Sequence, residues 1–336
     1  MAKKKEFDFS DASLIDDILR KKYGASYEVG IDSTIDNEPV STGSIRLDMA
    51  LRIPFPVGVH ELYGANQSGK TTTALHAYKN ATEKGWYAMY VDLEQPALDD
   101  SSVERVGIDP STFRRYRPTS GEDACEFVLD IFKHRESAFV VFDSVGSLVS
   151  GVDLAKQMDE NSMGIEAKLM TKFLKKVGNV IGRNHGRLII INQIRDNLSS
   201  YGGHETTPGG NYIKHAAISR VRFAGGTGKI RAIVEKDGKK EKIVGYMTTA
   251  TIIKNKRAGG SGVGQSVDIP IYSVGGFYQP LELVQLGSEL GVITKNTSWF
   301  IYGDEKYHGE AAVLDAMMNN EELFKEIRAK VLDLCE

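Results

Sequence analysis

The sequence predicts an α/β fold in which helices cover both faces of a mainly parallel sheet. From residue 57 onward, short apolar runs alternate with segments of helical periodicity, which is the order that builds parallel sheets. The apolar runs are continuous, as expected for strands that are buried on both faces. A glycine-rich turn at residues 64–69 joins the first run to the first helical segment. These features favour an open sheet with its ligand site at the carboxyl ends of the strands.

Length and composition indicate a large globular domain with small appendages. The 336 residues can bury a sizeable core, and no apolar run approaches the ~20 residues that a membrane span needs. The first residues are basic but lack the apolar segment of a secretory signal. Cys125 and Cys335 lie far apart in the sequence, which argues against a disulfide framework or a zinc site and favours a cytoplasmic protein. Because the net charge is −3, a nucleic-acid site requires a local concentration of Lys and Arg.

The first predicted element is a short amphipathic helix at residues 11–24, with Gly24 as its C-terminal cap. A polar stretch, residues 26–41, separates it from the next apolar segment. We therefore expect residues 1–34 to form an arm that packs on its own core or on a neighbouring subunit. Its apolar face consists of Leu14, Ile15, Ile18 and Leu19.

The remaining elements follow in order. Four apolar runs are predicted to be buried strands: residues 57–63, 87–93, 138–145 and 187–194. Three segments between them have helical spacing: residues 70–85, 122–135 and 164–185. After Ala216, residues 217–224 and 243–256 flank a Lys-Asp-Gly turn, and we expect antiparallel strands there. Residues 35–270 are thus predicted to form the core, and residues 271–336 a small C-terminal α/β domain that ends in a helix.

The turn after the first strand indicates a nucleotide site. Its sequence, GANQSGKT, fits G-x-x-x-x-G-K-[ST] and lies between a predicted strand and a predicted helix, as the phosphate-binding motif requires. Glycines allow the backbone N–H groups to turn toward phosphate oxygens, and the helix N-terminus adds its positive dipole end. Lys70 would contact the β- and γ-phosphates, and Thr71 would bind Mg²⁺. The predicted nucleotide-binding residues here are Gly64, Ala65, Asn66, Gln67, Ser68, Gly69, Lys70, Thr71 and Thr72.

Polar residues at three further strand ends point to the same site. Asp143 ends an apolar strand and is the expected carboxylate for the metal, together with Thr71. Glu94 follows another strand and could activate a water for attack on the γ-phosphate, with Asp92 as its rival. Gln193 ends the fourth strand, where an amide could sense the γ-phosphate. The carboxyl ends of parallel strands lie at one edge of the sheet, so these side chains are expected to converge.

With these residues in place, the chain resembles RecA-type DNA recombinases along nearly its whole length. The segments that carry the resemblance occur in the family's order: STGSIRLDMAL, GANQSGKTTTAL, DLEQPALD, VVFDSVGSL, IIINQIR, ETTPGGNYIK, TTATIIKNK and SWFIYGDEKYHGE. NQIR combined with TPGGN and KNK is more specific than a phosphate loop alone. The resemblance implies a RecA-like P-loop NTPase core that uses ATP and Mg²⁺.

The resemblance also implies residues that act across a protomer interface and around the base. Lys254 and Lys256 match a lysine pair that reaches the ATP of the adjacent protomer and stabilises γ-phosphate charge there. Gln193 matches the amide that couples the nucleotide to the DNA loop. Asp99, Ser102 and Tyr272 match nucleotide-binding positions. Ser102 stands where bacterial relatives have an adenine-stacking tyrosine, so adenine affinity is expected to be weaker unless Tyr272 compensates.

Two segments match the family's DNA-binding loops, at about residues 157–164 and 195–211. Met163 matches a residue that inserts between bases, and Tyr201 an aromatic suited to stacking. The other residues expected to contact DNA are Lys168, Thr171, Lys175, Arg195, Gly209, Gly210 and Asn211. Thr249 and Thr251 replace basic residues of the secondary DNA site in relatives, and the Lys-rich segment 228–242 is expected to take over that function.

The function implied is that of an ATP-dependent DNA recombinase. Protomers would join head to tail into a helical filament on single-stranded DNA and pair it with a duplex, with DNA-stimulated ATP hydrolysis. The divergence from bacterial members would suit a phage-encoded homologue. Two alternatives remain open at this stage: a hexameric ring helicase on the same core, and a non-catalytic mediator that binds ATP.

Overall fold

The computed structural model describes residues 12–23, 38–94, 98–151, 164–196, 205–224, 231–237, 240–273 and 275–334. The chain divides into two units, residues 1–37 and residues 38–336. In the first unit, helix α1 (Ala12–Tyr23) forms where the sequence predicts it, with Arg20, Lys21 and Lys22 in its last turn. Cations in the last turn are favoured because they face the negative end of the helix dipole. The boundaries proposed for the arm and the C-terminal domain stay predictions.

The second unit is built on a ten-stranded sheet in the order β12-β11-β10-β8-β1-β5-β4-β2-β3, with β9 also paired to β10. Pairing is parallel from β8 through β3 and antiparallel among β8, β9, β10, β11 and β12. The mainly parallel α/β fold is therefore confirmed. The strands of the large sheet are β1 (Gly58–Gly64), β2 (Tyr87–Asp92), β3 (Arg115–Tyr116), β4 (Ala138–Asp143), β5 (Arg187–Gln193), β8 (Ser219–Ala224), β9 (Arg231–Asp237), β10 (Lys240–Asn255), β11 (Ser266–Tyr272) and β12 (Gly276–Phe277).

The antiparallel pairing expected for residues 217–224 and 243–256 is confirmed, because β8 pairs antiparallel to β10. Strand β8 also pairs parallel to β1, which the sequence did not indicate. The short helix α8 (Tyr212–Ala216) lies between β5 and β8 in the chain. It returns the chain to the edge where β1 begins, so β8 runs in the same direction as β1. Strand β8 is therefore the junction between the parallel and antiparallel parts of the sheet.

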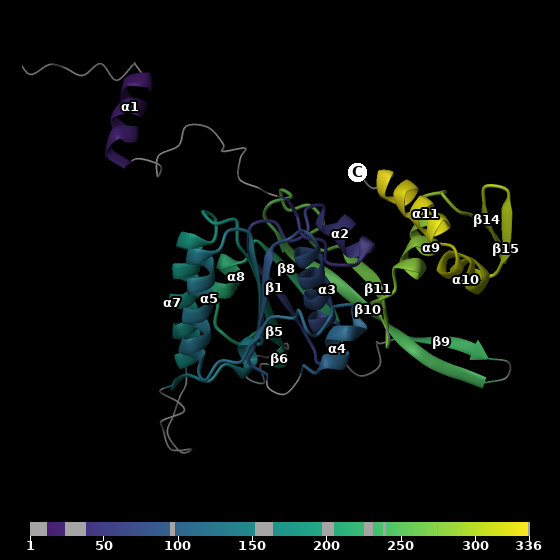
Figure 1. Ribbon diagram of the computed structural model, residues 1–336, viewed down its shortest axis with the longest axis horizontal. Coiled ribbons are helices and arrows are strands. Elements are labelled where there is room, and N and C mark those ends of the chain that lie inside the picture. Colours follow the sequence, from purple (N-terminus) through teal and green to yellow (C-terminus); the bar gives the residue numbers. More distant parts are fainter. Residues whose placement is uncertain are drawn as a thin grey trace, which may run out of the picture. The chain divides into compact units, whose positions relative to one another are not determined.

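Helices cover both faces of the sheet, as Figure 1 shows. Helices α2 (Ile45–Leu51), α3 (Lys70–Glu83) and α4 (Asp100–Arg105) share a core with Ile189 and Ile191 of β5. Helices α5 (Gly121–His134), α7 (Ile165–Val180) and α8 share the other core with Leu188 and Ile190. Since side chains alternate along a strand, the continuous apolar sequence of β5 supplies both cores.

A smaller module follows the sheet. Helices α9 (Gln279–Glu289), α10 (Glu310–Asn319) and α11 (Glu321–Asp333) enclose their own apolar core with a three-stranded sheet. Glu282 of α9 joins this module to α2, because its carboxylate accepts hydrogen bonds from Ser44 Oγ at 2.5 Å and from Ile45 N at 2.8 Å. The strands of the module are β13 (Thr294–Asn296), β14 (Trp299–Tyr302) and β15 (Glu305–His308).

Strands β9 and β10 form a ribbon that extends beyond the helices (Figure 1). Its register pairs Lys240 with Asp237, Glu241 with Lys236, and Lys242 with Glu235. The expectation that this segment replaces the secondary DNA site stays a prediction. Within the described residues, no helix combines the length and apolarity needed to cross a membrane.

Candidate functional site

The phosphate loop lies at the carboxyl end of β1, a central strand. Lys70, the first residue of α3, donates hydrogen bonds from Nζ to the carbonyls of Gly64 at 3.1 Å and Ala65 at 2.6 Å. Gly69 has a φ of 96°, and a Cβ there would lie 2.5 Å from Cδ1 of Ile271, so this turn needs glycine. Burial lowers the pKa of Lys70, while the carboxylates of Asp143 and Glu94 raise it. The ammonium group is thus held inside the curl of the loop, where phosphates are expected.

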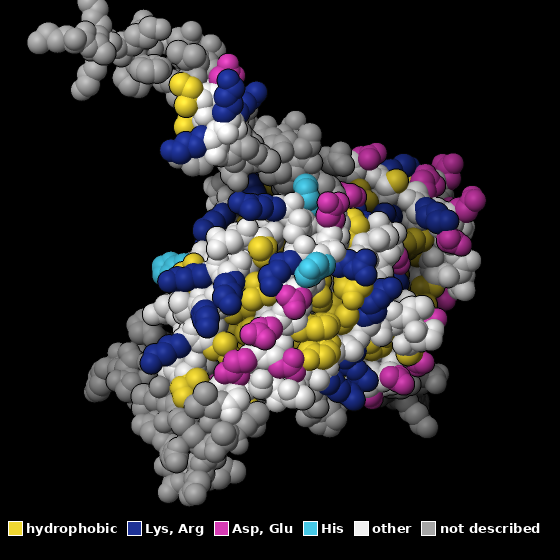
Figure 2. All heavy atoms as spheres, turned by 60° about the vertical axis from the view of Figure 1, so that its left-hand side comes forward, with side chains coloured by type: hydrophobic (Ala, Val, Ile, Leu, Met, Phe, Trp, Pro, Cys, Tyr) yellow, Lys and Arg dark blue, Asp and Glu magenta, His cyan; other side chains and the backbone are white. Residues whose placement is uncertain are grey.

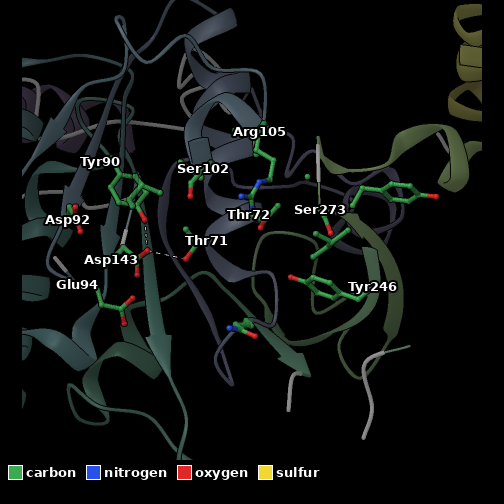
Figure 3. Close-up of a pocket in the computed structure, with 17 residues that line it drawn as sticks. Thr71, Thr72, Tyr90, Asp92, Glu94, Ser102, Arg105, Asp143, Tyr246 and Ser273 are labelled. Atoms are coloured by element: carbon green, nitrogen blue, oxygen red, sulfur yellow. Dashed lines mark hydrogen bonds between the residues drawn. The ribbon is translucent and has the colours of Figure 1, made fainter. Parts of the chain in front are cut away.

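Asp143 lies beside this loop at the end of β4. Its Oδ2 accepts a hydrogen bond from Thr71 Oγ1 at 3.2 Å and another from the hydroxyl of Tyr90. Burial raises the pKa of Asp143 to about 6, against the effects of these hydrogen bonds and of Lys70. Figure 3 shows the Thr71 and Tyr90 side chains pointing toward the carboxylate. Sequence reasoning missed Tyr90, since a tyrosine in a strand that also contains Tyr87 is not by itself a sign of a functional site.

Glu94 and Gln193 meet at the same edge of the sheet. The amide Nε2 of Gln193 donates to Oε1 of Glu94 at 2.5 Å, and Ser144 Oγ donates to the same oxygen at 3.3 Å. Asp92, the rival for the base function, ends β2, and its carboxylate lies 3.6 Å from Nε of Arg117. The arrangement favours Glu94 over Asp92 because Glu94 contacts the residue at the end of β5.

A cavity of about 460 Å³ lies beside these groups. Glu94, Asp92 and Asp143 line one end of it, and Thr71 and Thr72 lie on the α3 side (Figure 3). The lining also includes three further residues expected from the sequence: Gln67, Ser102 and Tyr272. It continues with residues that the sequence did not indicate: Leu75, Tyr90, Leu98, Arg105, Val106, Tyr246, Ile271, Ser273 and Gly276.

Asp99 makes a different contact from the one expected. Its carboxylate caps α4 by accepting from Ser102 N at 2.9 Å and Ser102 Oγ at 2.6 Å, and it also accepts from Ser101. These hydrogen bonds lower the pKa of Asp99. Asp99 is not part of the cavity lining, whereas its neighbours Leu98 and Ser102 are. A contact between Asp99 and the nucleotide stays a prediction.

The lysine pair lies apart from this cavity. Lys254 Nζ donates to the carbonyls of Lys214 and His215, and Lys256 Nζ donates to His215 O at 3.2 Å. Both ammonium groups therefore sit at the C-terminal end of α8, where the helix dipole favours cations. Burial lowers the pKa of Lys254 to about 8, with the positive charges of Lys256 and Arg220 adding to the effect. Since neither lysine lines the chain's own cavity, their position is consistent with action on another protomer.

A buried polar network, which the sequence did not indicate, joins three central strands. Arg220 Nε donates to Oε2 of Glu61 at 2.5 Å, and Asn192 Nδ2 donates to Oε1 of Glu61 at 3.1 Å. Asn192 Nδ2 also donates to the carbonyl of Pro208 at 3.0 Å. All three side chains are buried. The network links strands β1, β5 and β8 to the segment that precedes α8.

Several residues expected to contact DNA lie together on one face of α7. A groove of about 460 Å³ is lined by Lys168, Thr171 and Lys175, together with Ala167 and Lys172. Lys172 was not expected from the sequence. Lys175 Nζ lies 5.7 Å from the centre of the Tyr212 ring, which places α8 beside this groove. Figure 2 turns this side of the molecule forward and shows several Lys and Arg side chains on it, with acidic ones among them.

Gly209 and Gly210 fit closely against the same face. Gly209 has a φ of 81°, and a Cβ there would lie 2.6 Å from Cδ1 of Ile213. Gly210 has a φ of 79°, and its Cβ would lie 3.0 Å from Cβ of Ala167. The chain's own packing therefore requires glycine here, in addition to any need for close approach by DNA. Asn211, the next residue, is exposed and precedes α8.

Some predicted DNA contacts cannot be placed. Met163 and Tyr201 lie outside the described residues, as does most of each predicted loop. Of the first loop, Gly164 is described. In the second, Arg195 belongs to the short strand β6 (Arg195–Asp196), which pairs with β7 (Glu205–Thr206). This pairing therefore holds the start of that loop against residues 205–206.

Comparison with known proteins gives a consistent result along the chain. Residues 13–274 match the family model of the RecA N-terminal domain, and residues 281–336 match that of the RecA C-terminal domain. Protein RecA of Chloroherpeton thalassium is 36% identical over 93% of this chain and 86% of its own length. Protein RecA of Chlorobium limicola is 35% identical over 95% of this chain and 89% of its own length. Protein RecA of Porphyromonas gingivalis is 33% identical over 92% of this chain and 88% of its own length.

Proposed function

Because the chain belongs to the RecA family of ATP-dependent DNA recombinases, we propose that the carboxyl edge of its sheet binds and hydrolyses ATP in response to DNA. The observation that carries this proposal is the convergence of four strand ends. These residues follow or end four strands: Lys70 follows β1, Asp143 ends β4, Glu94 follows β2 and Gln193 ends β5. Asp143 and Glu94 line one cavity, Gln193 donates a hydrogen bond to Glu94, and the ammonium of Lys70 interacts electrostatically with both carboxylates. Membership of the family along the whole chain does not favour a ring helicase or a non-catalytic mediator.

The proposed hydrolysis assigns one task to each group. The N–H groups of residues 64–69 and the Lys70 ammonium hold the phosphates. Glu94 accepts a proton from the attacking water, which requires its carboxylate to turn from Gln193 toward the γ-phosphate. Gln193 then exchanges its contact with Glu94 for one with the γ-phosphate. This exchange is how the nucleotide state would reach the loop that begins at residue 195.

The residues present fit a divalent cation such as Mg²⁺. Thr71 and Asp143 supply a hydroxyl and a carboxylate that lie 3.2 Å apart. No group of three or more His, Cys, Asp or Glu side chains with metal-site geometry occurs within the described residues. A small number of protein ligands is sufficient for Mg²⁺, because this ion keeps several bound waters and also binds the phosphates of the substrate. Thr71 and Asp143 would hold the ion, which would neutralise charge on the phosphates. A nearby cation would also favour the ionised form of Asp143.

The DNA contacts and the assembly are proposed from positions outside the cavity. Single-stranded DNA would lie along the α7 groove, with phosphates near Lys168 and Lys175 and backbone N–H groups of residues 209–211. Lys254 and Lys256 would complete the ATP site of the next protomer, so the contact is head to tail and propagates a helical filament. Pairing of the bound strand with a duplex would then supply sequence specificity.

ATP turnover with and without single-stranded DNA tests this proposal. Lys70→Ala should reduce turnover at least a hundredfold, on the order of 3 kcal/mol or more of lost transition-state stabilisation. Glu94→Gln should bind ATP but hydrolyse it about as poorly. Lys79→Ala is the matched control, because it removes a lysine from the same helix outside the cavity lining. Wild-type turnover in Lys70→Ala would refute the assignment.

A further inference from the structure

The two ends of the nucleotide cavity differ in chemistry. Carboxylates from Asp92, Glu94 and Asp143 line one end. Elsewhere the lining gains apolar and aromatic surface from Leu75, Val106, Ile271, Tyr246 and Tyr272. The cation of Arg105 and the hydroxyl groups of Ser102 and Ser273 lie among these lining residues. A nucleoside triphosphate has the same polarity, with charged phosphates and metal at one end and a flat, weakly polar base at the other. The aromatic end is therefore where a base belongs.

Tyr246 is held in a fixed position relative to the phosphate loop. It lies on β10, and Thr248, two residues further on, donates from Oγ1 to the carbonyl of Ser68 at 2.8 Å. Side chains two residues apart on a strand share a face, so Tyr246 faces the loop as Thr248 does. Its partner across the ladder is Ile271, which lies against Gly69. Figure 3 shows the Tyr246 side chain reaching from its strand into the cavity.

The ring of Tyr246 is also the more available of the two aromatic rings. Tyr272 is already paired with Tyr278, with ring centroids 4.0 Å apart and planes inclined by 33°. Tyr246 shows no ring stacking within the described residues, and it is half-buried against the α3 side of the core. Burial raises the pKa of its hydroxyl, with nearby Arg105 acting in the opposite direction. The phenol is therefore neutral at physiological pH, and its face can receive a base.

The opposite wall leaves room for that base. Ser102, a small residue, lines the α4 side of the cavity, and Arg105 lies one turn further along the same helix. We propose that Tyr246 is the stacking surface for the base of the bound nucleotide, opposite the small side chain of Ser102. This inference rests on the proposed function, because it assumes that the cavity binds ATP. It makes Tyr246 a determinant of nucleotide affinity rather than of phosphate binding.

The test compares two ligands on the full-length protein. Binding of ATP is measured by displacement of a ribose-labelled fluorescent ATP, and binding of inorganic tripolyphosphate is measured in the same assay. Tyr246→Ala should weaken ATP about tenfold, in the range of one lost base–aromatic stack. Tripolyphosphate, which has no base, should bind within twofold of wild type. Tyr246→Phe keeps the ring and should bind ATP within twofold of wild type.

Three outcomes would overturn the inference. Unchanged ATP affinity in Tyr246→Ala would show that the ring does not contact the base. Equal weakening of ATP and tripolyphosphate would show that the residue acts only through the shape of the phosphate loop. A loss in Tyr246→Phe as large as in Tyr246→Ala would assign the effect to the hydroxyl. If wild-type protein binds neither ligand, the proposed function itself fails, which is a different result from any of these three.

Discussion

The amide of Gln193 donates a hydrogen bond to the carboxylate of Glu94, with Nε2 and Oε1 2.5 Å apart. The contact joins the last residue of β5 to a residue just beyond β2. It places the group expected to activate water against the residue that leads into the second predicted DNA loop. A change at either residue is therefore expected to reach the other.

Gln193→Ala should uncouple DNA from hydrolysis. The variant loses the amide that links Glu94 to the segment starting at residue 195, while Lys70 and Thr71 are untouched. We expect ATP binding within about twofold of wild type and loss of roughly tenfold or more of the DNA-stimulated rate, which corresponds to one charge-assisted hydrogen bond. Steady-state ATPase assays with and without single-stranded DNA measure this. Stimulation equal to wild type would rule out the coupling assigned to Gln193.

The lowered pKa of Lys254 predicts that DNA-stimulated ATP turnover depends on pH. The pKa of its ammonium is lowered to about 8, so the charged form is complete well below pH 8 and is lost as the pH rises through that value. If the charge acts on ATP in the next protomer, DNA-stimulated turnover should fall above about pH 8. Lys254→Arg keeps its charge across this range, so any activity it retains should not show that fall. A profile with the same alkaline fall in Lys254→Arg would assign the fall to another group.

The lysines of α7 predict a salt effect. The logarithm of the affinity for single-stranded DNA falls as the logarithm of the salt concentration rises. Removing one phosphate contact should make this negative slope shallower by about 0.7. Lys168→Ala and Lys175→Ala should each do so and weaken binding at low salt, as measured by fluorescence anisotropy with a labelled oligonucleotide. Lys133→Ala on α5 is the control, since Lys133 pairs with Asp130 outside this groove. Unchanged slopes for both α7 variants would remove this groove from the DNA path.

Glu282 predicts a pH-dependent stability. Burial raises its pKa from 4.5 to about 7, against hydrogen bonds from Ser44 and Ile45 and with added repulsion from Asp48. The folded state thus retains a proton that the unfolded chain releases, so the stabilisation is complete below pH 4.5 and is lost as the pH rises through 7. The loss amounts to about 3 kcal/mol. Urea unfolding of wild type and Glu282→Gln should therefore give curves whose difference changes between pH 5 and 8. A constant difference would contradict the raised pKa.

The parallel core and the phosphate site were predictable because each rests on a local signal. Continuous apolar runs mark β1, β2, β4 and β5, and the spacing of Gly64, Gly69 and Lys70 marks the turn between strand and helix. The antiparallel pairing of β8 with β10 was predicted, but its parallel pairing with β1 was not, because the apolar pattern of a strand is the same whether its neighbour runs parallel or antiparallel. Only the return of the chain through α8 determines that direction.

The residues missed by the sequence depend on contacts between distant segments. Tyr246 lies more than 170 residues after the phosphate loop, and the β10 register alone brings it to the cavity. Glu61 and Arg220 form an ion pair across two strands that are 159 residues apart in sequence. Each of these side chains, read alone, is typical of a strand in an ordinary sheet. These contacts therefore follow from the tertiary structure and could not be predicted from residue spacing in the sequence.

The proposed function requires the chain to form a filament on DNA in response to ATP. Electron microscopy of the full-length protein with single-stranded DNA and a slowly hydrolysed ATP analogue would show whether it does. We expect helical filaments on the DNA that are lost without nucleotide and in Lys70→Ala. Closed rings, or isolated protomers under the same conditions, would contradict this expectation.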